Sequence, residues 1–268
     1  MISILIRNKN ESKALDKTLK SIHTQHFTVP FEIVVVDDGS TDNSVEVARK
    51  HGCKVVSLDK AFTYGYAINF GVKQCQYDII LLLSSHNILL SNDFPEKLIQ
   101  YFSDPKVAGV RCTPIANTKQ VEQSLEGVIS LDKANYSHSN DWQNLLIANC
   151  SAIRKEVALE IVFNEAIRSN EEKLWCLDIM EKGYSILSNT PCYFLYNKQN
   201  NSSALLRDLI SKYQIDGLKS KSFSSYLLLL IKSVPWAFKI ALTTWYNTVK
   251  MHSLTLLIPI KHRKGIYK

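Results

Sequence analysis

The sequence predicts an α/β fold in which a mostly parallel central sheet is flanked by helices. Short, uninterrupted β-branched runs such as Ile33–Val36 are typical of parallel strands that are buried on both faces. Over the first 112 residues such runs alternate with segments whose apolar residues recur at helical spacing, and this alternation favours a parallel sheet with helices on both faces. At 268 residues, the chain can bury a substantial core as one large domain, or as one domain with an appendage.

The N-terminal part of the chain divides into five expected strands and the helices between them. The strands are Ile2–Arg7, Ile33–Val36, Lys54–Ser57, Asp78–Leu83 and Val107–Cys112. Helices are expected over the apolar repeat of Leu15, Leu19 and Ile22, from Val45, over Tyr64–Cys75 and from Pro95. Gly65 and Gly71 lie inside the third helix against its propensity, which indicates close backbone packing or a nearby ligand.

The C-terminal part of the chain is less regular. Residues from Pro114 to Trp142 are polar and weakly patterned, which indicates a loop or excursion. A strand is expected over Leu145–Ile153, a helix over Asn170–Lys182 and a further strand over Tyr184–Leu187. From about residue 200 the sequence becomes helical and basic, so we expect a first domain over residues 1–200 and a helical basic extension over residues 201–268.

The extension carries the excess positive charge. From Arg207 onward there are eleven Lys and Arg against two Asp, a net +9, so the preceding residues carry −2 of the total of +7. A nucleic-acid binder spreads its basic residues over the folded surface, so nucleic acid is not an expected partner. Aromatic residues beside lysines suit a helix lying on an anionic membrane surface, and packing on the first domain or on a partner subunit, as in a homo-oligomer, is the alternative. The apolar runs are shorter than the roughly 20 residues that span a bilayer.

The six cysteines indicate a reducing compartment. They are scattered without a Cys-x-x-Cys pair, so neither a zinc site nor a disulfide framework is predicted. Most lie in apolar sequence and are expected to be reduced core thiols. Met1–Ile6 begin a strand directly, with no signal peptide before them. We therefore expect a cytoplasmic protein, peripheral at the inner face of the cell membrane if the extension binds there.

A strand that runs into two carboxylates and a tight turn is the most informative local feature. Asp37 and Asp38 follow the second strand, and Gly39 permits the turn. Ser40, Thr41 and Asp42 offer oxygens to cap the next helix. Open α/β sheets bind ligands at the carboxyl ends of their strands, so the two acids are placed to accept hydrogen bonds from a base or a ribose. The alternative is a purely structural turn.

Further motifs follow this turn in a fixed order. They are Val35-Val36-Asp37-Asp38-Gly39-Ser40-Thr41-Asp42, Asn69-Phe70-Gly71 with the apolar strand to Leu83, Asn149 with Arg154-Lys155, Phe163-Asn164-Glu165, and Glu171-Glu172 with Trp175 and Gly183-Tyr184 behind them. Over about residues 1–195 the ordered set resembles the family 2 glycosyltransferases, which have the GT-A fold. The resemblance implies an inverting enzyme that moves a sugar from a nucleotide-sugar donor to a hydroxyl of a glycan or lipid-linked acceptor in surface polysaccharide biosynthesis.

The resemblance also implies roles for the residues at the donor side. The acidic turn binds the nucleotide in that family, so the resemblance implies this role for Asp37 and Asp38, with Asp38 expected to contact the base or ribose, and Asn8 and Asn69 are expected beside it. The family's Asp-x-Asp, which holds a divalent metal on the diphosphate, is replaced by Ser84-Ser85-His86.

This replacement leaves two interpretations of the donor phosphate site. Serine hydroxyls are poor ligands for Mg²⁺, whereas an imidazole ligates Mn²⁺, so His86 with Ser84 is expected either to bind a divalent metal, Mn²⁺ or Mg²⁺, or to contact the diphosphate directly. Some rhamnosyltransferase-like members look similar in having a Ser-x-His. A histidine that merely caps a strand end is the structural alternative.

The catalytic base is expected on the late helix. In the family the second member of an acidic pair takes the proton of the acceptor hydroxyl, and that position is Glu172, with Glu171 before it. Trp175 is expected on the acceptor side, together with the Pro114–Trp142 segment. The alternative is that both acids merely favour the positive end of a helix dipole.

Other classes of function fit less well. The chain has no Gly-x4-Gly-Lys-Ser/Thr and no Gly-x-Gly-x-x-Gly, which disfavours a P-loop enzyme and a dinucleotide-binding fold. A receiver-type signalling domain pairs two acids after a strand, but is far shorter. The remaining rival is a nucleotide-sugar-binding relative without transferase activity, because the Asp-x-Asp is missing.

Overall fold

The computed structural model describes residues 1–115, 126–167 and 169–196. The chain divides between Lys198 and Gln199, so the description concerns the first of two units, and the predicted helical extension lies outside the described residues. The strands are β1 (Ile2–Asn8), β2 (Phe31–Asp37), β3 (Lys54–Ser57), β4 (Ile79–Ser84), β5 (Asn87–Leu89), β6 (Val107–Pro114), β7 (Ile129–Leu131), β8 (Cys150–Arg154) and β9 (Ser185–Tyr196). The helices are α1 (Ser12–His23), α2 (Ser44–Lys50), α3 (Tyr64–Gln74), α4 (Phe94–Gln100), α6 (His138–Asp141), α7 (Lys155–Glu160) and α8 (Glu171–Glu181), with short 3-10 turns at Tyr101–Ser103 and Trp142–Asn144.

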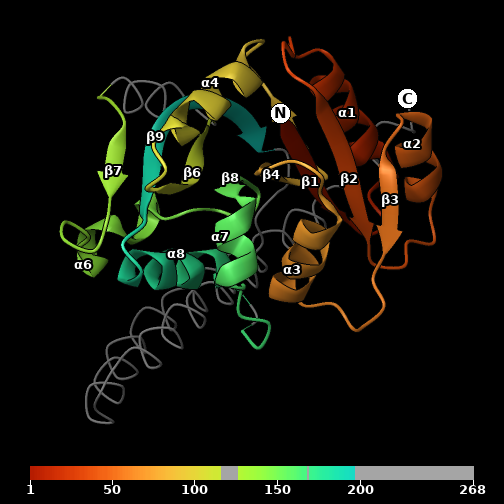
Figure 1. Ribbon diagram of the computed structural model, residues 1–268. Helices are drawn as coiled ribbons and strands as arrows, with labels where there is room; N and C mark the ends of the chain where they lie inside the picture. The colour runs from red at the N-terminus through yellow and green to blue at the C-terminus, as the bar shows by residue number, and fades with distance from the viewer. Residues whose placement is uncertain (116–125, 168, 197–268) are drawn as a thin grey trace, which may run out of the picture. The chain divides into compact units, whose positions relative to one another are not determined.

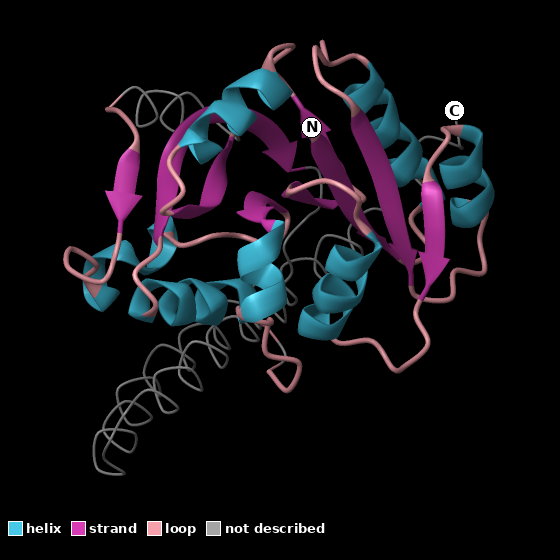
Figure 2. Ribbon diagram, in the orientation of Figure 1, coloured by secondary structure: helices cyan, strands magenta, loops and turns pink. Residues whose placement is uncertain are grey.

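One sheet organises these elements, in the order β3-β2-β1-β4-β8-β6-β9-β5, with β7 also paired to β9 (Figures 1 and 2). The first four strands of this order are parallel, as the alternation of strands and helices predicts. β8 runs antiparallel between β4 and β6, β6 and β9 are parallel, and β5 and β7 are antiparallel to β9. The parallel half therefore presents a common carboxyl edge, formed by the ends of β1, β2 and β4.

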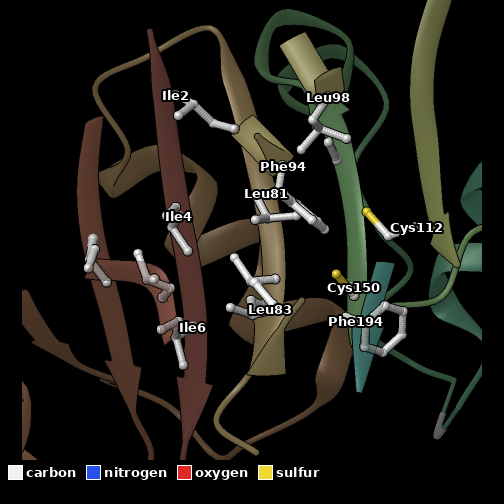
Figure 3. Packing of buried hydrophobic residues seen from close by; sticks show 14 of the residues in the cluster. Ile2, Ile4, Ile6, Leu81, Leu83, Phe94, Leu98, Cys112, Cys150 and Phe194 are labelled. Atoms are coloured by element: carbon white, nitrogen blue, oxygen red, sulfur yellow. The ribbon is translucent and has the colours of Figure 1, made fainter. Parts of the chain in front are cut away.

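The core follows from the two-residue period of the strands. Ile4 and Ile6 of β1 belong to a buried cluster with Leu15 and Leu19 of α1. Figure 3 shows these β1 side chains beside those of β4, with the side chains of α4 continuing the same layer toward β8 and β9. Leu5, between them in the sequence, is buried on the other face, where α3 packs. The strands are thus covered on both faces, which explains their uninterrupted apolar sequence.

The glycines inside α3 serve close packing. A Cβ at Gly71 would lie 2.5 Å from Leu5 Cδ1 of β1. A Cβ at Gly65 would collide with the backbone carbonyl of Asn164. Of the two predicted explanations, close packing is confirmed at both positions, because α3 approaches the sheet and the 163–165 segment more closely than a side chain permits.

The structure corrects the prediction for Leu145–Ile153. The strand in this region is β8, which begins only at Cys150, and Leu145 and Leu146 are buried without pairing to another strand. Leu146 instead fills the space above Gly109 of β6. A short apolar run does not reveal whether its burial comes from strand pairing or from packing of an irregular segment, which is why the prediction was wrong.

Three further strands, β5, β7 and β9, were missed or underestimated. β5 is three residues long and too polar at its start to be recognised. β9 extends to Tyr196, well beyond the predicted Leu187, because it pairs with β6 through register shifts that carry it past Pro191. Within the weakly patterned 114–142 region, the described part includes β7 and α6.

Candidate active site

Three neighbouring strands carry the residues predicted for the donor side. β1 ends at Asn8, β2 at Asp37 and β4 at Ser84. In the sheet register Asn8 lies opposite Asp37, and Arg7 lies opposite Ser84. The predicted residues of these strands are therefore gathered at one carboxyl edge, where open α/β sheets bind ligands.

Asp37 is buried and shapes the turn after β2. Its Oδ2 accepts from the backbone N–H of Ser40 at 2.8 Å, and its Oδ1 accepts from Ser40 Oγ at 2.6 Å and from Asn8 Nδ2 at 3.2 Å. Gly39 adopts a φ of +68°, as predicted for this turn. The carboxylate of Asp37 and the Nδ2 of Asn8 thus hold the loop in shape, and contacts of these two residues with a nucleotide stay predictions.

Asp38 is more accessible than Asp37. Its Oδ2 accepts a hydrogen bond from Lys9 Nζ at 2.7 Å, and the Lys9 side chain is more than half exposed. A pairing between exposed charges contributes little to stability and exchanges readily. Asp38 is accordingly the acid of this turn that a ligand can reach by displacing Lys9.

The N-cap of α2 is Asn43, and of the three residues predicted to cap this helix Asp42 accepts a hydrogen bond from its first residue. Its Oδ1 accepts from the backbone N–H of Ser44, the first residue of α2, and its Oδ2 accepts from the N–H of Ser12, the first residue of α1. Hydrogen bonding from the Ser44 side chain, followed by that from the backbone N–H of Ser12, lowers the pKa of Asp42 to about 2. Ser40 bonds to Asp37 instead, and Thr41 donates its N–H to Asn10 Oδ1 at 2.7 Å.

The amide of Asn69 is used within the protein. Its Nδ2 donates to the carbonyl of Phe163 and to Glu165 Oε1, both at 2.8 Å, and its Oδ1 accepts from the N–H of Phe163 at 2.9 Å. These bonds fasten the 163–165 segment to α3. A contact between Asn69 and a nucleotide stays a prediction.

His86 lies in the turn between β4 and β5. Its Nδ1 is 2.8 Å from Glu11 Oε2, and Ser85 Oγ donates to the same oxygen at 2.7 Å. Sequence reasoning missed Glu11. The only signal for it was its place directly after the polar corner Asn8–Asn10, at the same edge of the sheet.

The acidic pair opens α8, as predicted. Glu171 and Glu172 are 2% and 8% exposed, and Asn170 before them adopts a left-handed φ of 62°. Burial and the neighbouring charge of Glu172 raise the pKa of Glu171 to about 8. Burial also raises the pKa of Glu172. Because the charge of Glu172 raises the pKa of Glu171, the two carboxylates titrate as a pair.

Arg7 connects the strand edge to this acidic pair, and sequence reasoning missed it as well. Its Nη1 lies 3.8 Å from Glu171 Oε1, and its Nη2 donates to the carbonyl of Ala148 at 2.6 Å. Its guanidinium lies 5.6 Å from the centre of the Tyr64 ring. The positive charge of Arg7 lowers the pKa of both Glu171 and Glu172, against the effect of burial.

Trp175 is part of the core. It is 1% exposed, its Nε1 donates to the carbonyl of Ile161 at 2.5 Å, and its ring stacks on Phe163 with 5.0 Å between centres. A contact between Trp175 and an acceptor stays a prediction. Trp175, which belongs to the motif set that resembles the family, packs α8 against Phe163 in the segment that Asn69 holds.

The donors for a metal ion are sparse. In the described part of the chain, no group of three or more His, Cys, Asp and Glu side chains is arranged to hold an ion. At the position of the family's Asp-x-Asp, His86 and Glu11 contact each other, and Ser84 contributes only a hydroxyl.

Within the residues that the structure describes, no helix is both long enough and apolar enough to cross a membrane.

These features agree with what comparison with known families finds. The model of glycosyl transferase family 2 matches residues 3–162, more than half of the chain. The chain belongs to glycosyl transferase family 2. The family predicted from the ordered motifs is therefore confirmed.

Two curated relatives are similar to this family member in sequence. It is similar to the poly-beta-1,6-N-acetyl-D-glucosamine synthase of Staphylococcus epidermidis, at 25% identity over 264 residues that cover 88% of this chain and 62% of the relative. It is also similar to the chondroitin synthase of Pasteurella multocida, at 34% identity over 87 residues that cover 31% of this chain and 9% of that protein. The chain thus spans less than two thirds of the length of these relatives.

Solved structures of glycosyltransferases share the fold. The mannosyltransferase PcManGT from Pyrobaculum calidifontis, in complex with GDP-Man and Mn²⁺, matches with a TM-score of 0.67 and 16% identity over 100% of this chain and 81% of that chain. Residues 1–349 of Staphylococcus aureus TarS, in complex with UDP-GlcNAc, match with a TM-score of 0.58 and 17% identity over 87% of this chain and 71% of that chain. The predicted GT-A fold is confirmed.

Proposed function

We propose that this family 2 member is an inverting glycosyltransferase that moves a sugar from a nucleotide-sugar donor to a hydroxyl of a glycan or lipid-linked acceptor in surface polysaccharide biosynthesis. The observation that carries the proposal is the buried Glu171–Glu172 pair, joined through Arg7 to the ligand-binding edge of the sheet. Sugar transfer needs both parts: an edge that holds the activated donor and a carboxylate that takes a proton from the acceptor. The named activities of the relatives support the same class of reaction.

On the donor side, Asp38 is proposed to contact the base or ribose. Its present partner, Lys9, is exposed and easily displaced. Asp37 and Asn8 support this contact by holding the turn that presents Asp38. Asn69 fastens the 163–165 segment to α3, and its contact with the nucleotide remains part of the proposal.

On the acceptor side, Glu172 is proposed as the general base. Its carboxylate takes the proton of the acceptor hydroxyl as the oxygen forms a bond to the anomeric carbon, and the bond to the diphosphate breaks with its electron pair leaving on the nucleoside diphosphate. Because attack and departure occur on opposite faces, the configuration inverts. Burial raises the pKa of both Glu171 and Glu172 and the two titrate as a pair, so the pair must give up a proton before Glu172 can act as the base.

A divalent cation fits the donor phosphate site only with most of its ligands supplied by the donor. His86 offers one ring nitrogen, because the other contacts Glu11, and Ser84 offers a weak hydroxyl. This donor set suits Mn²⁺ better than Mg²⁺, since an imidazole ligates the softer ion. Such a cation would neutralise charge on the leaving diphosphate. PcManGT was solved with Mn²⁺ and GDP-Man, and a glucosyl-3-phosphoglycerate synthase from Mycobacterium tuberculosis with Mn²⁺ and UDP.

The alternative function, binding of a nucleotide sugar without transfer, is favoured by the missing Asp-x-Asp alone. An active enzyme hydrolyses its donor slowly in the absence of acceptor, and a pure binding protein does not.

The proposal also includes a cytoplasmic location, contact of residues 201–268 with the inner face of the cell membrane, and formation of a homo-oligomer. Liposome flotation and light scattering test the last two of these.

The decisive experiment replaces the proposed base. After thermal-shift screening of nucleotide diphosphates and their sugars has identified a donor, Glu172→Gln is expected to keep donor affinity and to lower turnover by about 10²- to 10⁴-fold. Glu160→Gln, the same substitution at an exposed position of α7, is the matched control and keeps wild-type turnover. Near-normal turnover of Glu172→Gln would remove this residue from the mechanism. If the wild-type protein does not hydrolyse the donor at all, the result would favour the binding function.

A further inference from the structure

The turn that carries His86 is held by contacts from distant parts of the chain. Ser85 is buried, and its carbonyl accepts a hydrogen bond from Thr18 Oγ1 of α1 at 3.0 Å. The His86 ring meets the ring of Tyr196, at the end of β9, edge to face with 5.2 Å between centres. The position of the imidazole is therefore determined by packing, since elements on both sides of the turn restrict it.

Glu11 adds a chemical constraint to this position. One oxygen, Oε2, receives the hydroxyl of Ser85 at 2.7 Å and lies 2.8 Å from His86 Nδ1. A carboxylate oxygen accepts hydrogen bonds and donates none. In a neutral ring, the hydrogen must therefore be on Nδ1, which leaves the lone pair on Nε2.

We propose that Glu11 is a positioning residue that fixes His86 as its Nδ1–H tautomer, so that the site presents the Nε2 lone pair to the donor. The consequence for donor binding rests on the proposed function. A neutral ring in this state ligates a cation or accepts a hydrogen bond through Nε2, but it cannot donate one to a phosphate oxygen. Carboxylates act in this way behind metal-ligating histidines, where they fix the tautomer and the orientation of the ring.

The tautomer can be observed without any donor. The full chain is labelled with ¹⁵N-histidine, and two-bond proton–nitrogen correlations are recorded near pH 8.5, about two units above the ordinary pKa of histidine. His86→Gln identifies the signals of His86. We expect the ¹⁵N chemical shift of Nδ1 to be that of a protonated ring nitrogen, and that of Nε2 to be that of an unprotonated one.

Two variants separate positioning from a general structural effect. Glu11→Ala is expected to lose this pattern in favour of the Nε2–H tautomer that free histidine prefers. Ser85→Ala is the matched control, because it removes the other hydrogen bond to Glu11 Oε2 but leaves the carboxylate beside His86. It is expected to keep the wild-type pattern. The signals of His138, whose Nδ1 lies 3.0 Å from the hydroxyl of Tyr136, report whether each variant retains its fold.

An Nε2–H pattern in the wild-type protein would overturn the proposal, even if Glu11→Ala does not fold. Retention of the Nδ1–H pattern in folded Glu11→Ala would overturn it as well. Neither result depends on turnover, so a failure of the tautomer assignment is distinct from a failure of the glycosyltransferase function, which only the transfer assay detects.

Discussion

Replacing Arg7 by Met tests whether the charge at the strand edge lowers the pKa of the acidic pair of α8. Met retains much of the buried aliphatic length but removes a guanidinium that lies 3.8 Å from Glu171 Oε1. Because Arg7 lowers the pKa of both Glu171 and Glu172, its loss raises both. At this separation and an effective dielectric constant of about 20, two unit charges interact by roughly 4 kcal/mol, and relaxation reduces the pKa change to about one to three units.

The sign of the expected effect follows from the role of Glu172. A base must be deprotonated, so activity rises with pH through its pKa, and a higher pKa moves this acidic limb toward alkaline pH. Arg7→Met is therefore expected to lower kcat/KM at neutral pH by about 10- to 10³-fold and to recover part of it as pH rises.

The assay is the pH profile of kcat/KM for donor and acceptor. Arg7→Lys serves as the comparison, because it keeps a positive charge but lacks the second nitrogen that donates to Ala148. It should shift the acidic limb by less than Arg7→Met. An acidic limb that stays at its wild-type position in folded Arg7→Met would refute the electrostatic argument and, with it, the link between strand edge and acidic pair.

Three further results are expected. Asp38→Ala should weaken binding of the free nucleoside diphosphate and of the intact donor alike, measured by calorimetry, and an unchanged diphosphate affinity would rule out a nucleoside contact at Asp38. Trp175→Ala should destabilise the fold by about 3–5 kcal/mol in denaturant titrations, because the ring is fully buried against Phe163, and a loss below about 1 kcal/mol would contradict its assignment to the core. Activity should fall on chelation and return better with Mn²⁺ than with Mg²⁺, so full activity after exhaustive chelation would show that His86 needs no metal.

The sequence alone determined the parallel half of the fold and the family. β3 spans the predicted Lys54–Ser57, and β1, β2 and β4 lie within about one or two residues of their predicted bounds. These elements are predictable because buried parallel strands and amphipathic helices have periods that a short window of sequence contains. The polar residues at the strand ends were located for the same reason, since a parallel sheet brings its carboxyl ends to one edge.

Only the tertiary structure decided what these residues contact. Glu11 meets His86 across 75 residues of sequence, and Arg7 of β1 meets Glu171 of α8. The tertiary structure also buried Trp175, used Asp37 to shape its turn and paired Asp38 with an exposed lysine. Such contacts arise when elements far apart in the chain pack together, and no local period records them. The pKa of the acidic pair belongs to this second group, because burial and the guanidinium of Arg7 both reach it through the fold.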